Sequence, residues 1–294
     1  MNEVTIVVVL HNSAAHLHAF LDALPAATEG VPAWQLVVVD NGSIDDGPAQ
    51  VIARAPHAVV IRQENLGYAA GINVGIGVAE PSRAVLVVNP DVTLGPGCVA
   101  ALLDEIADPG VGIAVPLVLT PERRLVWSLR REPTVLRALG EAVLGGGRAG
   151  RFPALGEVVC DPSAYRRSAR ADWASGCVML ISRACLEAVG AWDERYFLYS
   201  EETDFALRAR DAGLALRLTP SAVATHVGGD ISPRLWSMLT VNRVRLFARR
   251  HRPAHTALFW GVVTINEALR APFGPPIHRA ALGALLRPSR WGAL

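Results

Sequence analysis

The sequence has no lysine, so all 28 of its Lys or Arg positions are arginines, a bias that we attribute to genome composition. Its four cysteines form neither a Cys-x-x-Cys pair nor a metal-binding spacing, a pattern typical of a reduced, cytoplasmic protein. No apolar run reaches the roughly 20 residues that a membrane-spanning helix needs. The first apolar run is too short for an export signal and has no basic region before it.

The charges are few and unevenly distributed. The formal net charge of +1 gives no electrostatic reason to expect a nucleic-acid partner. Residues 234–294 nevertheless contain ten arginines and one acid, so we expect residues 231–294 to form a basic, amphipathic helical region. This region is either a solvated arginine-rich helix face or a peripheral contact with an anionic membrane. The membrane interpretation rests on the interleaving of Trp236, Leu239, Phe247, Arg243, Arg245, Arg249 and Arg250.

Short apolar runs alternate with helical apolar spacing, which predicts a mostly parallel sheet flanked by helices. The predicted strands are 5–10, 36–39, 58–61, 84–88, 111–115, 177–181 and 214–218. The predicted helices are 13–24, 47–55, 67–79, 97–107, 182–189, 201–212 and 232–250. Ser13 and Ser232 stand where helix caps are expected, and Pro25 where a helix stop is expected. Residues 140–170 lack periodicity and predict a mobile loop or excursion.

Polar turns follow two of the predicted strands, at residues 40–43 (Asp-Asn-Gly-Ser) and 89–91 (Asn-Pro-Asp). Each is either an ordinary strand-ending turn or part of a site, because ligands of parallel sheets bind beyond the carboxyl ends of the strands. In the second case Asp40 and Asp91 share one site, and Asp91 holds a divalent cation. A dinucleotide-binding turn is disfavoured, because the turn after the first strand, residues 11–13, has no glycine.

Two more motifs have a structural and a functional interpretation. Gly67, Gly71 and Gly75 recur every four positions, so either a helix packs tightly on the sheet or a ligand approaches closely. Residues 199–204 (Tyr-Ser-Glu-Glu-Thr-Asp) open a predicted helix, where acids complement the helix dipole. One of these acids is also a candidate general base.

In their order along the chain, the four motifs resemble those of glycosyltransferase family 2, and most closely its bacterial rhamnosyltransferase branch. They are Asp-Asn-Gly-Ser (40–43), Asn-Leu-Gly-Tyr-Ala-x-Gly-x-Asn-x-Gly (65–75), Asn-Pro-Asp (89–91) and Trp-Asp-Glu-x-Tyr-Phe-x-Tyr-x-Glu-Glu-x-Asp (192–204). The resemblance spans roughly residues 4–250. It implies an α/β fold of the GT-A type, residues 1–230, with a Rossmann-like nucleotide-sugar-binding half (1–118) and an acceptor half (119–230). The region 231–294 would follow as a helical extension.

The resemblance implies that Asp40 hydrogen-bonds a pyrimidine base. The other residues expected to line the nucleotide are His11, Asn12, Asn41, Ser43, Asn65, Gly67, Asn73 and Asn89. His11 departs from the usual tyrosine of the family, and Asn89 replaces the first aspartate of its metal motif. Asp91 and His226 would hold the divalent metal, Mn2+ or Mg2+.

On the acceptor side, Glu202 matches the general base of the family, with Glu201 as the reserve candidate. The small-residue turn beside the donor sugar corresponds to Ser175 and Gly176. The acceptor-side loop corresponds to Trp192, Asp193 and Glu194. Asp204 would support the acceptor or the helix.

The resemblance therefore implies a metal-dependent, inverting hexosyltransferase of cell-wall or polysaccharide biosynthesis. The favoured donor is dTDP-rhamnose, ahead of UDP- and GDP-linked sugars, and the acceptor would be a glycan or a lipid-linked glycan. A nucleotidyltransferase, a non-catalytic nucleotide-sugar-binding protein and a retaining transferase are the alternatives. We expect a cytoplasmic protein, either free or peripheral on the inner face of the membrane.

Overall fold

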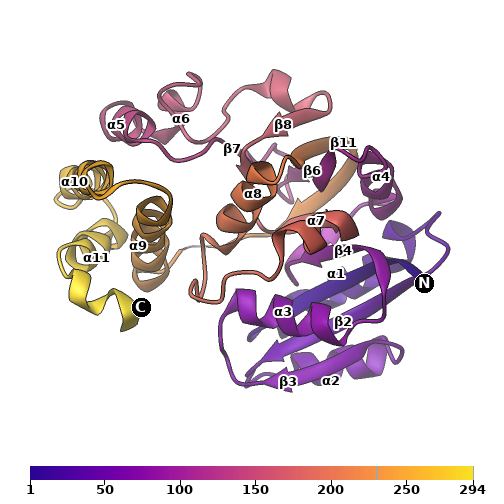
Figure 1. Cartoon of the computed structure of the whole chain (residues 1–294). Helices are drawn as coiled ribbons and strands as arrows, with labels where there is room; N and C mark the ends of the chain where they lie inside the picture. Colours follow the sequence, from indigo (N-terminus) through magenta and orange to yellow (C-terminus); the bar gives the residue numbers. More distant parts are fainter. Residues whose placement is uncertain (230, 294) are drawn as a thin grey trace. The chain divides into compact units, whose positions relative to one another are not determined.

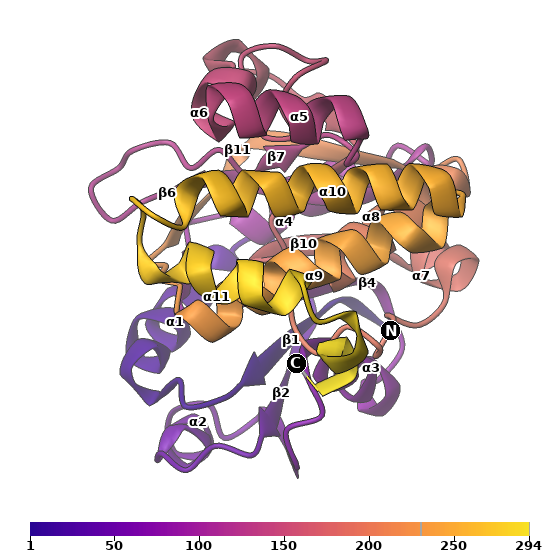
Figure 2. The same ribbon diagram turned by 90° about the vertical axis from the view of Figure 1, so that its left-hand side faces the viewer.

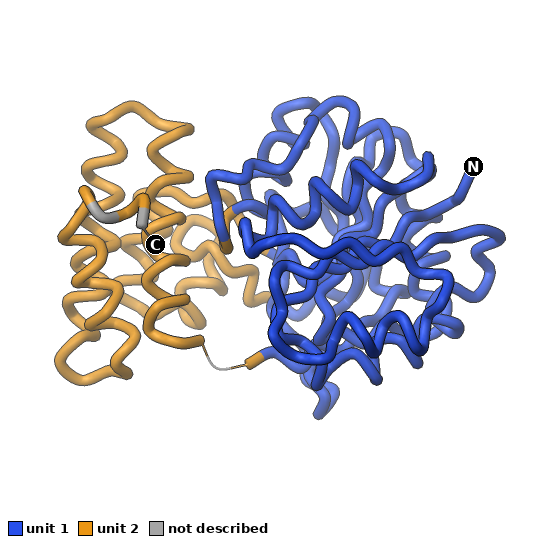
Figure 3. Tube along the Cα trace, turned by 90° about the horizontal axis from the view of Figure 1, so that it is seen from below, with its two compact units in different colours: residues 1–129, 162–197, 201–228 blue, residues 130–161, 198–200, 229–294 orange. Residues whose placement is uncertain are grey.

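The computed structural model describes residues 1–229 and 231–293, which form two compact units (Figure 3). Unit 1 comprises Met1–Leu129, Pro162–Phe197 and Glu201–Gly228. Unit 2 comprises Arg130–Asp161, Leu198–Ser200 and Gly229–Leu294. Residue 230, at the predicted domain boundary, and residue 294 lie outside the described residues. The division of unit 1 into donor and acceptor halves stays a prediction.

Unit 1 is built on a nine-stranded sheet within the described residues, in the order β3-β2-β1-β4-β10-β6-β11-β5, with β8 paired to β11. Strands β1 to β4 are parallel, whereas β10 is antiparallel to both β4 and β6. This confirms the predicted α/β class with its mostly parallel sheet. The strands are β1 (Asn2–Leu10), β2 (Trp34–Asn41), β3 (Val59–Gln63), β4 (Ser82–Val88), β5 (Val92–Leu94), β6 (Val111–Leu119), β8 (Ala169–Ala171), β10 (Val178–Ser182) and β11 (Ala215–His226). A separate pair joins β7 (Leu129–Arg130) and β9 (Trp173–Ala174).

Helices cover both faces of this sheet (Figure 1). They are α1 (Ala14–Ala27), α2 (Gly47–Arg54), α3 (Tyr68–Val78), α4 (Cys98–Glu105), α7 (Arg183–Val189) and α8 (Glu201–Asp211), with a 3-10 turn at Pro162–Tyr165. Side chains alternate along β1, so one row joins the core under α1, α2 and α4 and the other row faces α3. A Cβ on Gly71 or Gly75 would lie within 2.7 Å of Val9 or Val7. Tight helix-on-sheet packing therefore accounts for these two glycines.

Of the predicted helix caps and stops, one agrees with the structure and two do not. Ser232 caps its helix as expected, because its hydroxyl accepts a hydrogen bond from Leu235 N at 3.3 Å. Ser13 does not cap α1; Asp45 does so instead, with its Oδ2 accepting from Ala14 N at 2.8 Å. The helix also runs past Pro25 to Ala27. A proline in the last turn removes only one donor, so it does not end the helix.

Unit 2 is helical and has its own apolar core, which includes Val241, Phe247, Phe259 and Val263. Its helices are α5 (Val135–Leu144), α6 (Gly146–Ala149), α9 (Pro233–Arg250), α10 (Pro253–Arg270) and α11 (Pro276–Leu285), followed by a 3-10 turn at Pro288–Ala293. α5 lies beside α10, and α11 lies beside α9 (Figures 1 and 2). None of the helices in the described part of the chain combines the length and apolar character needed to cross a membrane.

Two expectations for this region are corrected. Residues 140–170 are not one irregular loop, because they contain the end of α5, α6 and a 3-10 turn, but the alternative of an excursion agrees with the assignment of residues 130–161 to unit 2. The interleaved apolar and arginine side chains of residues 236–250 do not all form an exposed membrane face, because Phe247 is only 3% exposed. Arg243 forms ion pairs with Glu141 and Glu157, which draw this arginine into the unit.

Candidate functional site

The turns after β1 and β2 are joined to each other at the carboxyl end of the sheet. Asn12 N donates to Ser43 Oγ at 3.0 Å, and Asn12 Oδ1 accepts from Ile44 N at 2.9 Å. The His11 Nδ1 atom lies 2.9 Å from Asn41 O. Asn12 adopts a φ of 54°, a left-handed conformation that asparagine tolerates. Four residues expected to line the nucleotide therefore form one continuous surface.

Asp40 is the buried acid of this surface, with 4% of its area exposed. Its Oδ1 accepts a hydrogen bond from Ser43 N at 2.9 Å, which fixes the turn. Its Oδ2 lies 4.0 Å from Arg62 Nε, too far for a hydrogen bond. A carboxylate has several acceptor positions, so the fixed turn leaves Asp40 with acceptor capacity for a ligand N–H.

The segment before α3 is held against both this surface and residue 197. Asn41 Nδ2 donates to Gly67 O at 2.8 Å, and Asn65 Oδ1 accepts from Gly67 N at 3.1 Å. Tyr68 N donates to Phe197 O at 2.8 Å. Gly67 has a φ of +99°, and a Cβ there would lie 2.6 Å from Phe197 O. Only glycine fits this close approach, so the first glycine of the repeat serves the loop and not the sheet.

Tyr68 lies near the acidic residues of the site. Its hydroxyl donates to Asn89 Oδ1 at 2.7 Å. Burial raises the pKa of Tyr68 well above its ordinary value, and the nearby carboxylates of Glu201, Glu202 and Asp91 raise it further. The phenol therefore remains a protonated donor among three acids. The sequence places Tyr68 in the motif at residues 65–75 without indicating a function, because nothing local shows which acids lie near it.

Asp91 and His226 lie side by side, with Asp91 Oδ2 3.0 Å from His226 Nε2. They meet because β11 pairs with β5, which places His226 opposite Val92. Burial favours a higher pKa for the Asp91 carboxyl, but the hydrogen bond and charge of His226 outweigh it, so this pKa lies below its usual value.

The Asp91–His226 pair offers two protein ligands for the predicted metal. A carboxylate oxygen and an imidazole nitrogen are both ligands for divalent ions. No group of three His, Cys, Asp or Glu side chains suited to a metal occurs in residues 1–229 and 231–293. An ion held by this pair would take its remaining ligands from other groups, such as diphosphate oxygens and water.

Glu202 lies against the turn that begins β10. A Cβ on Gly176 would be 2.9 Å from Glu202 Cβ, so the backbone of this turn contacts the glutamate directly. The same turn reaches the end of β4, where Asn89 N donates to Cys177 O at 2.9 Å. Glu202 is half-buried, whereas Glu201 is buried. Of the two acids, Glu202 is thus the more accessible to an acceptor.

Two residues with left-handed backbone precede these acids. Tyr199 has a φ of 68° and Ser200 a φ of 77°, both uncommon for residues with a side chain. Within unit 2, Asn242 Nδ2 donates to Leu198 O at 3.0 Å and to Tyr199 O at 3.3 Å. Strained backbone of this kind persists only where its surroundings enforce it.

The acceptor-side loop is fixed by Asn73. The Asn73 amide accepts from Trp192 N at 2.9 Å and donates to Trp192 O at 2.9 Å and to Glu194 Oε1 at 2.8 Å. The Trp192 ring stacks on Phe205 of α8, with ring centroids 4.6 Å apart. Asn73, expected to line the nucleotide, is thus engaged in holding this loop against α8.

The remaining predicted residues make local contacts. Asp193 Oδ1 accepts from Arg195 Nε at 2.9 Å, and Asp204 Oδ2 accepts from Arg208 Nε at 2.8 Å. Ser175 N donates to Ser128 O at 2.9 Å. The two aspartates therefore stabilise the loop and the helix. The central group consists of Tyr68, Asn89, Asp91, Gly176, Glu201, Glu202 and His226.

Comparison with known proteins supports the family resemblance. Residues 5–168 match the model of the family described as Glycosyl transferase family 2. The N-acetylglucosaminyl-diphospho-decaprenol L-rhamnosyltransferase of Mycobacterium tuberculosis is 33% identical over 235 residues, 75% of each chain. A low-salt glycan biosynthesis hexosyltransferase of Haloferax volcanii is 27% identical over 71% of this chain and 62% of its own.

Solved structures share the fold at low sequence identity. A mannosyltransferase of Pyrobaculum calidifontis, in complex with GDP-Man and Mn2+, has a TM-score of 0.58 at 18% identity, covering 99% of this chain and 83% of its own. GalNAc-T7 with UDP, GalNAc and Mn2+ has a TM-score of 0.61 at 14% identity. The match covers 83% of this chain but only 48% of that structure. These likenesses confirm the GT-A fold with its helical C-terminal region.

Proposed function

The chain belongs to glycosyltransferase family 2, and from this premise we propose that it transfers a sugar from a nucleotide diphosphate to an acceptor hydroxyl with inversion. The first candidate donor is dTDP-rhamnose, followed by UDP- and GDP-linked sugars. The choice follows the relative whose name specifies L-rhamnose transfer to a diphospho-decaprenol. A lipid-linked glycan of a bacterial cell-wall or polysaccharide pathway is accordingly the proposed acceptor.

One observation supports the proposal: the carboxylate of Asp91, which pairs with His226, and the carboxylate of Glu202 both lie near enough to Tyr68 to raise its pKa. A cation-binding pair supports the leaving diphosphate, and an accessible carboxylate supports removal of a proton from the acceptor. A cation-binding pair and a carboxylate near one half-buried tyrosine match the requirements of a single displacement. The proposed nucleotide surface around Asp40 is linked to this centre through Asn41 and Gly67.

In the proposed reaction, the acceptor oxygen attacks the anomeric carbon from the side opposite the nucleotide. Glu202 takes the proton of that hydroxyl as the new carbon–oxygen bond forms. The bond between the anomeric carbon and the phosphate oxygen breaks, and the diphosphate leaves with the electron pair. A divalent ion held by Asp91 and His226 would neutralise the charge that develops on the diphosphate. Tyr68 stays protonated and holds Asn89 in place.

Replacement of the base tests this assignment. We expect Glu202→Gln to lower kcat by about two to four orders of magnitude, because the amide cannot accept the proton. Donor binding should remain near wild type, since the change preserves the size of the side chain. Turnover of each candidate nucleotide sugar and donor affinity by calorimetry are the measurements. Glu187→Gln is the matched control, because Glu187 is an exposed helical glutamate outside the site.

Three outcomes separate the alternatives. Wild-type turnover in Glu202→Gln, with loss in Glu201→Gln, would transfer the base to the reserve candidate. Retention of the donor anomer in the product would replace inversion by a retaining reaction. Nucleotide-sugar binding without turnover of any candidate acceptor or of water would support the non-catalytic alternative.

A further inference from the structure

Helix α10 turns an uncharged apolar face to the solvent. Leu258, Ile265 and Leu269 are exposed, and their spacing of seven and four residues places them on one side of the helix. The two charged residues of α10 beyond its first turn, Glu267 and Arg270, form hydrogen bonds inside unit 2. Glu267 is buried and accepts from Trp236 Nε1 at 3.1 Å, and Arg270 donates to Glu141 O at 3.0 Å. An outer helix face without charge is unusual for a helix that remains in water.

Helix α5 repeats this pattern beside α10. Leu136, Leu139 and Val143 are exposed at intervals of three and four residues, so they also share one side of their helix. The two helices lie next to each other in unit 2 (Figure 2). Phe152 and Phe273, each three residues after the end of a helix (α6 and α10), are exposed as well, and Phe273 is 94% exposed. We call the apolar residues of these two helices, with the two phenylalanines, the α5–α10 face.

Scattered exposed apolar residues are ordinary, but two adjacent helices with apolar outer faces are not. A Leu or Ile that moves from water into an apolar environment gains free energy in proportion to the area it buries. The α5–α10 face therefore indicates a surface that is covered by a partner for part of the time.

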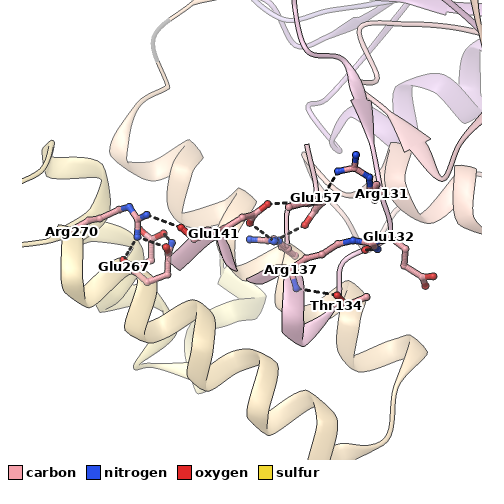
Figure 4. A network of polar contacts seen from close by, with 11 residues as sticks. Arg131, Glu132, Thr134, Arg137, Glu141, Glu157, Glu267 and Arg270 are labelled. Carbon is pink, nitrogen blue, oxygen red and sulfur yellow. Dashed lines mark hydrogen bonds and ion pairs between the residues drawn. The ribbon is translucent and has the colours of Figure 1, made fainter. Parts of the chain in front are cut away.

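The excess of positive charge in unit 2 indicates that this partner is anionic. The unit contains fifteen arginines and six acids. Four of the acids are paired inside the unit. Three of them, Glu141, Glu157 and Glu267, are labelled in the polar network of Figure 4. Glu132 pairs with Arg250. The exposed arginines of the unit include Arg148, Arg151, Arg234, Arg252, Arg279 and Arg287.

We propose that the α5–α10 face docks on a bilayer that contains anionic lipids. Its leucines, isoleucine and phenylalanines insert into the interfacial layer, and the exposed arginines reach the lipid phosphates. Apolar area and positive charge on the same helical unit are the two requirements of interfacial binding. This surface differs from the one suggested by the sequence, because Arg243 and Phe247 lie inside unit 2.

Vesicle flotation tests the proposal directly. Wild-type protein is mixed with vesicles of phosphatidylcholine containing about one third phosphatidylglycerol and is floated on a density gradient, without any nucleotide sugar. We expect wild-type protein to float with these vesicles at low salt and less at high salt, because salt screens the arginines. Vesicles of phosphatidylcholine alone should bind less.

The double variant Ile265→Glu and Leu269→Glu should lower the floating fraction at least tenfold, because it puts two carboxylates into the apolar face. The matched control is Ile52→Glu on α2 of unit 1, since Ile52 is 55% exposed and Ile265 is 57% exposed. The control should float like wild type. Both sites are exposed, so circular dichroism and melting temperature should show that every variant folds.

Three results would overturn the proposal: no flotation of wild-type protein on anionic vesicles, equal flotation of the double variant, or reduced flotation of the Ile52 control. A wild-type dimer that the double variant converts to a monomer, with no vesicle binding, would assign the face to a second copy of the chain. Because the assay uses no donor, protein that floats but transfers no sugar would contradict the proposed function alone.

Discussion

At the scale of single residues, the site depends on a few close contacts that leave no room for a side chain larger than that of glycine. The clearest is the contact of Gly176 with Glu202, where the glycine has no side chain to separate the backbone of the β10 turn from the glutamate. Gly67 and residue 197 form a second contact of this kind. These two glycines therefore set how closely the β10 turn approaches Glu202 and how closely the segment before α3 approaches Phe197.

Gly176→Ala tests the first contact. The added Cβ would lie 2.9 Å from Glu202 Cβ and 3.2 Å from its Cγ, so the glutamate must move. We expect kcat to fall on the order of 100-fold with little change in donor affinity, because small displacements of a catalytic group have effects of this size. Steady-state kinetics with a saturating donor provide the measurement.

Gly77→Ala is the control for this substitution. Gly77 lies in α3, and a Cβ added there meets no atom within 4 Å. This variant should keep wild-type kcat and gain about 0.5–1 kcal/mol of stability from the better helix former. Equal kinetics for the two alanine variants would show that the contact does not position the base.

At the scale of helices and strands, the sequence predicted what depends on local chemistry. It located Asp40 and Asp91 at strand ends because turn residues follow apolar runs there, and it predicted the Ser232 cap. The pattern of residues by itself missed contacts between distant partners, and the Asp91–His226 pair was expected only through the family resemblance. Asn73 meets Trp192 across 119 positions, and Arg243 meets Glu141 across 102 positions. An arginine on a predicted helix surface has the same sequence pattern whether water or two glutamates surround it.

The Arg243 ion pairs determine how α9 packs with residues 130–161. We expect Arg243→Leu to lower the free energy of unfolding by about 3–5 kcal/mol, because it leaves Glu141 and Glu157 without their counter-charge. Glu157→Gln should cost less. Burial raises the pKa of the Glu157 carboxyl, so losing its charge is comparatively easy.

Urea denaturation of these variants provides the measurement. Arg234→Leu is the control, because Arg234 lies exposed near the start of the same helix and should change the stability little. If Arg243→Leu unfolded at the wild-type midpoint, the buried pairs would have no net stabilising effect.

At the scale of the whole molecule, ligand binding should be visible as added stability. A nucleoside diphosphate at 100 times its Kd stabilises a protein by about 2.7 kcal/mol by mass action. We expect dTDP with Mn2+ to raise the melting temperature more than dTDP alone. EDTA should remove the additional shift.

Asp91→Asn should abolish the metal-dependent part of this shift and keep the part caused by the nucleotide, because the hydrogen bonds described for the surface around Asp40 are made by other residues. UDP and GDP in the same assay would rank the candidate donors. A full metal-dependent shift in Asp91→Asn would remove Asp91 from the cation site.

The pair of Asp91 and His226 joins residues 135 positions apart. Protein synthesis proceeds from the amino terminus, so His226 is the last residue of the central group to leave the ribosome. A nascent chain that stops after α8 already carries the tyrosine and both glutamates but lacks the imidazole. Premature termination between α8 and His226 therefore yields fragments that retain the acids of the site and lack the partner of Asp91.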